Sequence, residues 1–170
     1  STNSFGSDTS FTQNTIEVNL SGSQPQQPNC IPETQYPGSL NCGITEFNIG
    51  DFSKSSLNSI EGYSDFTCGN INLFVGEIYD FNVTHEGNAL QNFSMWLDIN
   101  NNGIFDLPNE EIYTNIGANF SASSIQIPTN AVLNTPLRLR IMADNTFQGG
   151  LIPCTNPVNG QAEDYSVLVS

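Results

Sequence analysis

Short stretches in which apolar and polar residues alternate recur along most of this chain, and no stretch has the longer period of an amphipathic helix. The clearest is Leu-Arg-Leu-Arg-Ile at 137–141, which places three aliphatic side chains on one face of a strand and both arginines on the other. Tyr79, Phe81 and Val83 share one face of another strand in the same way. This pattern restricts the chain to folds built from strands.

Strands are predicted at 44–49, 64–68, 78–84, 93–99, 112–115, 120–127, 136–143 and 163–169, with Gly, Pro or Asn between them. Many short strands without intervening helices predict an all-β fold, an antiparallel β-sandwich or jelly roll. The length of 170 residues suits one such domain, which we expect to cover 30–170. Residues 1–29 are rich in Ser, Thr, Asn and Gln, and only 16–20 alternate, so a linker or a peripheral strand is expected there.

The charge is strongly unbalanced, with 3 Lys and Arg residues against 17 Asp and Glu residues and a formal net charge of −14. Such a surface repels nucleic acid and anionic membranes, and it attracts divalent cations. No run approaches the roughly 20 apolar residues of a membrane-spanning helix. Neither nucleic-acid binding nor membrane insertion is therefore expected.

Four cysteines occur without the spacing of a zinc or redox motif. An even number in a chain poor in lysine predicts two disulfides and an oxidising compartment. Three pairings are possible, and the spacing favours Cys30–Cys42 together with Cys68–Cys154.

A calcium loop is predicted after the strand at 93–99. Oxygen-bearing side chains stand at alternate positions there, and Gly103 allows the sharp turn that folds them around one point. Calcium takes roughly six to eight such hard oxygen ligands. The predicted ligands are Asp98, Asn100, Asn102, Ile104 through its backbone carbonyl, Asp106 and Glu110.

Two features separate this loop from an EF-hand: the twelfth position is Asn109, and the segment before the loop is predicted as a strand. The alternative is a metal-free turn, because Asn, Gly and Asp also form ordinary turns. A weaker second acidic cluster comprises Asp65, Glu163 and Asp164, and its alternative is a turn whose carboxylates accept backbone hydrogen bonds.

Together these segments resemble the GEVED domain, a module of large secreted proteins, many from Bacteroidetes-type bacteria. The stretch that matches its Gly-Glu-Val-Glu-Asp signature reads Gly-Gln-Ala-Glu-Asp at 160–164, so position 161 offers no carboxylate. Further matching motifs stand at 63–67, 96–106, 127–128 and 137–140, and the resemblance covers roughly 30–170. It implies a β-sandwich accessory domain, exported to the cell surface or the medium, beside the catalytic or adhesive domains of a larger protein.

Two functions follow, both without catalysis. The first is binding of a polysaccharide or a cell-surface glycan, with candidate residues in predicted loops or on one strand face: Tyr36, Tyr113, Arg138, Arg140, Asn145 and Phe147. The second is a structural spacer or protein-adhesion module stiffened by calcium, with neighbouring domains as its partners. The single histidine, His85, has no nucleophile motif beside it, so no enzyme activity is predicted.

Overall fold

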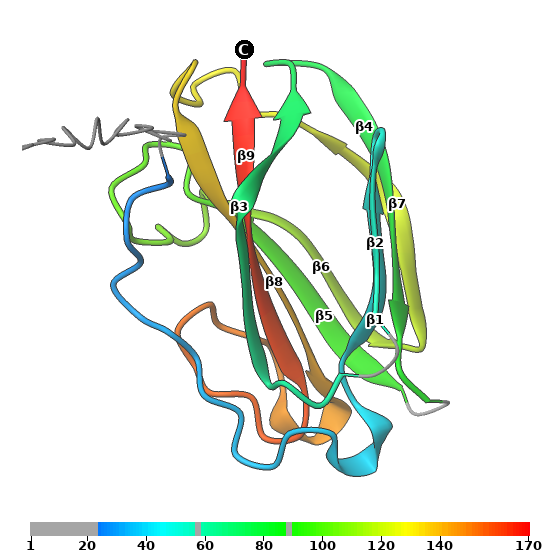
Figure 1. Ribbon diagram of the computed structural model, residues 1–170. Coiled ribbons are helices and arrows are strands. Elements are labelled where there is room, and N and C mark those ends of the chain that lie inside the picture. The colour runs from blue at the N-terminus through cyan, green and yellow to red at the C-terminus, as the bar shows by residue number, and fades with distance from the viewer. Residues whose placement is uncertain (1–23, 57–58, 88–89) are drawn as a thin grey trace, which may run out of the picture.

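The computed structural model describes residues 24–56, 59–87 and 90–170 and is a sandwich of two β-sheets (Figure 1). Its strands are β1 Ile44–Ile49, β2 Phe52–Ser55, β3 Tyr63–Leu73, β4 Ile78–His85, β5 Gln91–Leu97, β6 Glu111–Ala118, β7 Phe120–Gln126, β8 Pro136–Asn145 and β9 Gln161–Val169. Two short 3-10 helices, η1 Ser39–Asn41 and η2 Thr146–Gln148, lie in connections. In the described part of the chain, no helix is long and apolar enough to cross a membrane.

One sheet has four strands in the order β2-β1-β4-β7, and the other has five in the order β3-β9-β8-β5-β6. Most neighbours pair antiparallel, but β3 and β9 pair parallel, from Tyr63 opposite Ala162 to Leu73 opposite Val169. The chain passes from one sheet to the other between β6 and β7, where Asn119 alone separates the two strands. The predicted β-sandwich is confirmed.

The eight predicted strands are all present, and two details differ. β2 was not predicted, because its four residues are too few for alternation to stand out. β3 extends from Tyr63 to Leu73, well beyond the predicted end at residue 68, because a register shift between Phe66 and Asn70 interrupts its alternation.

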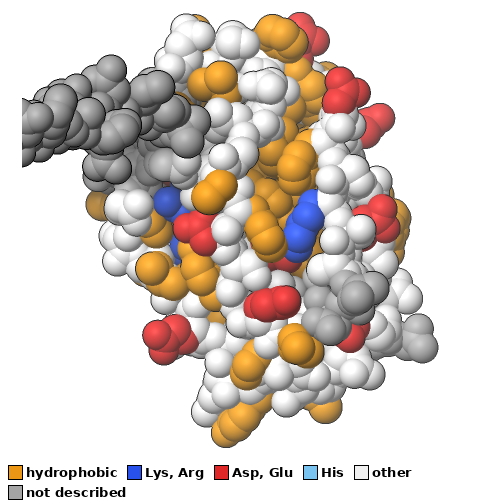
Figure 2. Space-filling view, viewed as in Figure 1, with side chains coloured by type: hydrophobic (Ala, Val, Ile, Leu, Met, Phe, Trp, Pro, Cys, Tyr) orange, Lys and Arg blue, Asp and Glu red, His pale blue; other side chains and the backbone are white. Residues whose placement is uncertain are grey.

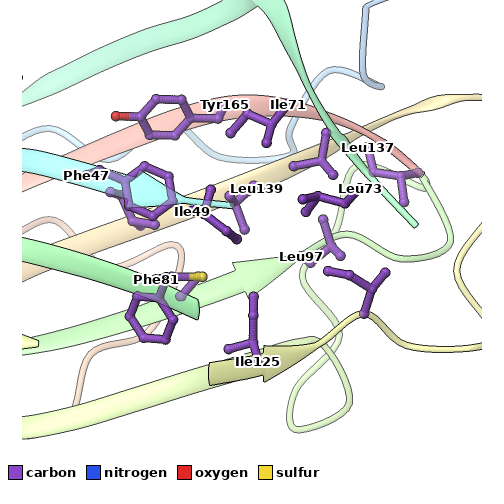
Figure 3. Packing of buried hydrophobic residues seen from close by; sticks show 14 of the residues in the cluster. Phe47, Ile49, Ile71, Leu73, Phe81, Leu97, Ile125, Leu137, Leu139 and Tyr165 are labelled. Carbon is purple, nitrogen blue, oxygen red and sulfur yellow. The ribbon is translucent and has the colours of Figure 1, made fainter. Parts of the chain in front are cut away.

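The core lies between the sheets and is formed by every second residue of each strand (Figure 3). On β8, the aliphatic side chains of Leu137, Leu139 and Ile141 face inward, as predicted. Phe47 and Tyr165, from opposite sheets, pack with their ring centroids 5.1 Å apart. Burial of these side chains is the main source of stability for the two layers.

The outer face of the five-stranded sheet is also buried. A small cluster of Trp96, Phe105, Met142 and Ala162 lies on it. The segment that begins at Gln24 runs along this face beside the loop between β8 and β9 (Figure 1), and Gln35 N donates to Pro157 O at 2.9 Å. Positions of β8 and β9 that point away from the core are therefore shielded from water on this side as well.

The N-terminal linker or strand predicted over 1–29 lies outside the described residues as far as residue 23. Residues 24–29 contact the turn that contains Gly103: Gln26 N donates to Asn101 Oδ1 at 2.9 Å, and Asn29 N donates to Gly103 O at 2.8 Å. The boundary at residue 30 remains a prediction.

The disulfide pairing predicted from spacing is wrong. Cys30 bonds to Cys154, with Cα atoms 5.6 Å apart, while Cys42 and Cys68 form no disulfide among the described residues. Cys30 and Cys154 lie in the two segments that meet over the outer face of the five-stranded sheet. Cys42 is buried just before β1, and Cys68 is exposed in the irregular part of β3.

Candidate functional site

The predicted calcium loop connects β5 to β6, and its two ends are held together at the sheet. Asp98 N donates to Arg138 O of β8, and Leu97 N donates to Glu110 O, both at 2.9 Å. Asp98 and Glu110 therefore face each other where the loop leaves the sheet, and both side chains are buried.

The carboxylate of Asp98 organises the first turn of the loop. Its Oδ1 accepts from Asn102 N at 3.1 Å, and its Oδ2 accepts from Gly103 N at 2.8 Å. Gly103 has φ +80°, and a Cβ atom there would lie 2.4 Å from the carbonyl oxygen of Gln27. Glycine is required at this position both by the backbone conformation and by the close approach of the N-terminal segment.

Glu110 closes the loop from its other end. Its Oε1 accepts from Ile99 N at 2.9 Å, and its Oε2 accepts from Asp106 N at 2.7 Å. Burial raises the pKa of Glu110 and of Asp98 above their ordinary values, although the backbone N–H donors act in the opposite direction. Each of these two carboxylates thus satisfies two backbone donors of the loop.

Asn100, Asn102 and Asp106 converge at the outer part of the loop. Oδ2 of Asp106 accepts from Asn100 Nδ2 at 3.1 Å and from Asn102 Nδ2 at 3.2 Å. The amide oxygens accept from backbone, Asn100 Oδ1 from Asn102 N and Asn102 Oδ1 from Ile104 N. A mostly polar hollow beside them is lined by Ile99, Asn100, Asp106, Asn109 and Glu110, with Asn130 from the connection between β7 and β8.

These residues fit a calcium loop in their order and their oxygen content. Within residues 24–56, 59–87 and 90–170, no three or more His, Cys, Asp or Glu side chains are arranged to hold a metal ion. A cation here would therefore also need the amide oxygens of Asn100 and Asn102 and backbone carbonyls such as that of Ile104, beside the carboxylates of Asp98 and Asp106.

The second acidic cluster is not brought together. Glu163 and Asp164 are consecutive on β9 and point to opposite faces of the sheet, as strand geometry requires. Asp65, on β3 opposite Asp164, is 49% exposed, and its Oδ1 accepts from Thr67 N at 2.9 Å. The three carboxylates are therefore unable to share one metal ion.

Asp164 instead lies in a buried ion-pair network on the outer face of the sheet. Its Oδ1 accepts from Arg140 Nε at 2.7 Å, and its Oδ2 accepts from Arg140 Nη2 and from Arg138 Nη1, both at 2.8 Å. Tyr63 Oη donates to the same Oδ2 at 2.9 Å. Arg140 also donates from Nη1 to Pro153 O and from Nη2 to Cys30 O, so it holds both disulfide-bearing segments on the sheet.

Glu163 points between the sheets, where Lys54 Nζ donates to its Oε1 at 2.7 Å. Gln161 Nε2 donates to Oε1 at 3.1 Å, and the Tyr165 hydroxyl donates to Oε2. Burial raises the pKa of Glu163 in spite of the lysine. All three cationic side chains of the chain, Lys54, Arg138 and Arg140, are thus paired with buried carboxylates.

Three of the six predicted glycan contacts are inaccessible. Arg138 and Arg140 are buried in the network with Asp164, and Asn145 is buried, donating from Nδ2 to Asn159. Tyr113 is half-buried and packs against Phe81 of the core, with ring centroids 4.7 Å apart. The two exposed members are Tyr36, at 54%, and Phe147, at 87%.

Two residues that bond to the buried carboxylates, Tyr63 at Asp164 and Lys54 at Glu163, were not predicted from the sequence. One signal could have pointed to Lys54: it is the only lysine in a chain whose positive charges are outnumbered by 17 acidic residues. Such a lone cation is a natural partner for a buried carboxylate, because a buried charge requires a counter-charge. Tyr63 carried no comparable signal, since its partner lies on another strand.

Residues 92–168 match the family model of the GEVED domain. This part of the chain is a GEVED domain. The matched span runs from β5 into β9 and holds the loop at 98–110, both arginines and Asp164. Tyr63 and the rest of the motif at 63–67 lie outside the match, although the parallel pairing of β3 with β9 brings them to it in space. No curated protein matches the chain.

Proposed function

We propose that this chain is a non-catalytic accessory module of a secreted bacterial protein that binds calcium through the loop at 98–110 and binds polysaccharide. GEVED is an accessory domain family, which supports the general role. The disulfide between Cys30 and Cys154 supports an oxidising compartment, since such bonds persist mainly outside the cytosol.

The observation that carries the calcium proposal is the convergence of Asn100, Asn102 and Asp106. The carboxylate of Asp106 is the negative group on which these side chains converge, and a bound cation would replace the two amide N–H donors that now contact its Oδ2. The net charge of −14 adds a long-range attraction for divalent cations. The buried bonds of Asp98 and Glu110 hold the loop in shape, which lowers the ordering cost of binding an ion.

Calorimetric titration with calcium, together with thermal unfolding in calcium and in chelator, tests the calcium proposal. Asp106→Asn removes a ligand charge from the exposed part of the loop, and we expect affinity to fall by roughly tenfold or more, since affinity depends on ligand charge. Asp51→Asn, an exposed acid in the turn between β1 and β2, is the matched control. Equal calcium affinity in wild type and Asp106→Asn would remove this assignment.

A catalytic role has little support from the single histidine. His85 is buried, its Nδ1 lies 3.0 Å from Ala118 O, and its ring packs 5.7 Å from that of Phe93. Burial lowers the pKa of His85, which favours the neutral ring of a core residue. No substrate could reach it without opening the sandwich.

A structural spacer or protein-adhesion module is the second candidate. It is favoured by the inaccessibility of Arg138, Arg140 and Asn145, and Tyr113 is half-buried, which leaves Tyr36 and Phe147 as the exposed members of the predicted glycan set. Binding assays against a polysaccharide panel separate the two candidates. A reproducible hit supports polysaccharide binding, and no binding to any polymer supports the spacer.

A further inference from the structure

One side of the sandwich is open. β2 is the edge of the four-stranded sheet and β3 is the edge of the five-stranded sheet, and in Figure 1 they flank the same gap between the layers. On the opposite side, the direct connection from β6 to β7 joins the two sheets. Figure 2 shows hydrophobic side chains gathered in a hollow on the open side, between β3 and β2.

Three hollows join end to end along this seam. The first lies between Lys54 and Phe66 and shares Phe52, Asn70 and Ile71 with the second. The second shares Asp51 and Asn72 with the third, which ends at Phe74 and Tyr79. The result is one continuous groove, long and open to solvent, which suits a linear polymer better than a compact ligand.

The groove offers aromatic surface at both ends. Phe66 is 37% exposed and Phe74 is 60% exposed. The ring of Phe66 stacks near Tyr165, with centroids 5.4 Å apart, and Lys54 Nζ lies 4.1 Å from its centroid. Both of these neighbours bond to the buried Glu163, so they fix the position of Phe66 while more than a third of its surface stays exposed to solvent.

Amide and carboxylate groups line the same groove. Asn70, Asn72 and Asp51 stand along its middle, and Asp80 stands at the end near Phe74. Aromatic rings at the two ends, with amide and carboxylate groups between them, match the apolar faces and the hydroxyl groups of sugar rings, since such sites combine apolar contact with a few polar groups.

The charge of the groove selects among glycans. Its one cation, Lys54, is neutralised by Glu163 at 2.7 Å, while Asp51 and Asp80 add negative charge. A uronate or sulfate polymer would meet a net negative surface and be repelled. A neutral polymer meets no such barrier.

An added peptide strand is the competing occupant, and the edges of the groove disfavour it. Strand addition requires a regular, unpaired backbone edge. β3 has a register shift between Phe66 and Asn70, and β2 is only four residues long. Irregular and short edges of this kind block pairing with a further strand.

We propose that the groove between β2 and β3 binds a neutral, linear polysaccharide, with Phe66 and Phe74 as its aromatic contacts. The inference rests on the polysaccharide binding proposed above and assigns it a place and a polymer class. It moves the site away from Tyr36 and Phe147.

The test is affinity electrophoresis of the 170-residue chain in calcium, in gels containing β-glucan, galactomannan, starch, alginate or polygalacturonate. Wild type is expected to be retarded by at least one of the three neutral polymers and by neither anionic one. Phe66→Ala and Phe74→Ala should each weaken binding by roughly tenfold, the factor that corresponds to an aromatic contact of about 1.4 kcal/mol. Phe147→Ala, which removes a more exposed ring elsewhere, is the matched control and should bind as wild type does.

Thermal unfolding of each variant establishes that it is folded, and Asn72→Ala at an exposed rim position gives a second probe without loss of an aromatic ring. Suppose that wild type binds a neutral polymer and that full affinity is kept by all three folded variants, Phe66→Ala, Phe74→Ala and Asn72→Ala. The assignment of the binding site to the groove is then wrong, while the proposed polysaccharide binding stands. Preference for an anionic polymer overturns the polymer class. If wild type binds no polymer, the proposed polysaccharide function fails together with the groove.

Discussion

Arg140 and Asp164 form a two-pronged ion pair on adjacent strands, with Nε 2.7 Å from Oδ1 and Nη2 2.8 Å from Oδ2. Neither side chain is exposed to solvent, and Arg138 Nη1 and Tyr63 Oη complete the shell around the carboxylate. The last residue of the Gly-Gln-Ala-Glu-Asp stretch therefore anchors a polar layer beneath the disulfide-linked segments, with a structural role in place of the predicted metal ligation.

Asp164→Asn should destabilise the domain strongly, because it removes the buried counter-charge that the guanidinium groups of Arg138 and Arg140 share. Breaking one side of a buried ion pair costs about 3–5 kcal/mol. Urea unfolding measures the loss. Asp65→Asn is the control: its carboxylate is 49% exposed and 3.9 Å from Arg138, and such pairs contribute about 1 kcal/mol or less. Equal effects of the two variants would contradict the central role of Asp164.

Gly103→Ala should destabilise the domain and loosen the N-terminal segment. The added Cβ would lie 2.4 Å from Gln27 O, at a residue with φ +80°, and the two effects together should cost about 2–4 kcal/mol. Gly149→Ala separates them, since Gly149 has φ +72° but no atom within 4 Å of its Cβ position. Gly149→Ala, at a residue with φ +72° and ψ −155°, should therefore show the backbone strain alone, about 1–3 kcal/mol in thermal or urea unfolding. A Gly103→Ala variant no less stable than Gly149→Ala would show that the contact with Gln27 is unimportant.

Alternation along the chain was sufficient to predict the eight longer strands and the inward face of β8, because burial between two layers imposes a period of two. It was insufficient for Arg138 and Arg140. The pattern assigned both to the face opposite the core, which is correct, but it carries no information about what covers that face. The segment from Gln24 and the loop before β9 cover it, and the contacts of the first segment with the arginines join residues more than a hundred positions apart.

Contacts between residues far apart in the sequence also explain why the disulfide pairing was predicted wrongly and why the bond of the Tyr63 hydroxyl was not predicted. Spacing along a chain does not report distance in space, so the bond between Cys30 and Cys154, separated by 124 positions, was not evident. The parallel pairing that brings Tyr63 beside Ala162 likewise leaves no local trace in the sequence. The loop at 98–110 could be predicted because its residues lie within one short segment.

The pH dependence of stability should carry the signature of Glu163. Its pKa is raised above the ordinary value of 4.5, with burial as the main cause. Between the unfolded and the folded pKa, the folded protein binds more protons than the unfolded chain, so stability falls as the pH rises through this range. This contribution is fully present below the unfolded pKa and is lost as the pH rises through the folded pKa.

Glu163→Gln removes this titration while keeping the size of the side chain. The free energy of unfolding of wild type, relative to the variant, should therefore decrease as the pH rises from 4.5 toward neutrality. Urea unfolding at a series of pH values gives the comparison, with Glu77→Gln at an exposed position as the control for loss of one carboxylate. A difference between wild type and Glu163→Gln that is constant across this range would contradict the raised pKa.

The two cysteines outside the disulfide should differ sharply in reactivity. Cys68 is exposed on β3, whereas Cys42 is buried, and burial raises the pKa of its thiol to about 11. Labelling with a thiol reagent under non-reducing conditions should modify Cys68 in the native protein and Cys42 only after unfolding. Cys68→Ser should abolish native labelling, and Cys42→Ser should leave it unchanged.

Loss of the disulfide between Cys30 and Cys154 should lower the free energy of unfolding of the domain. A cross-link over a separation of 124 residues stabilises by about 3–5 kcal/mol in the chain-entropy model, so the double variant Cys30→Ser, Cys154→Ser should unfold at lower urea concentration. Its unfolded chain should still label at Cys42 and Cys68. If the unfolded, non-reduced wild type instead labels at no cysteine, Cys42 and Cys68 are oxidised to each other, and sheet geometry near β3 must differ from that described.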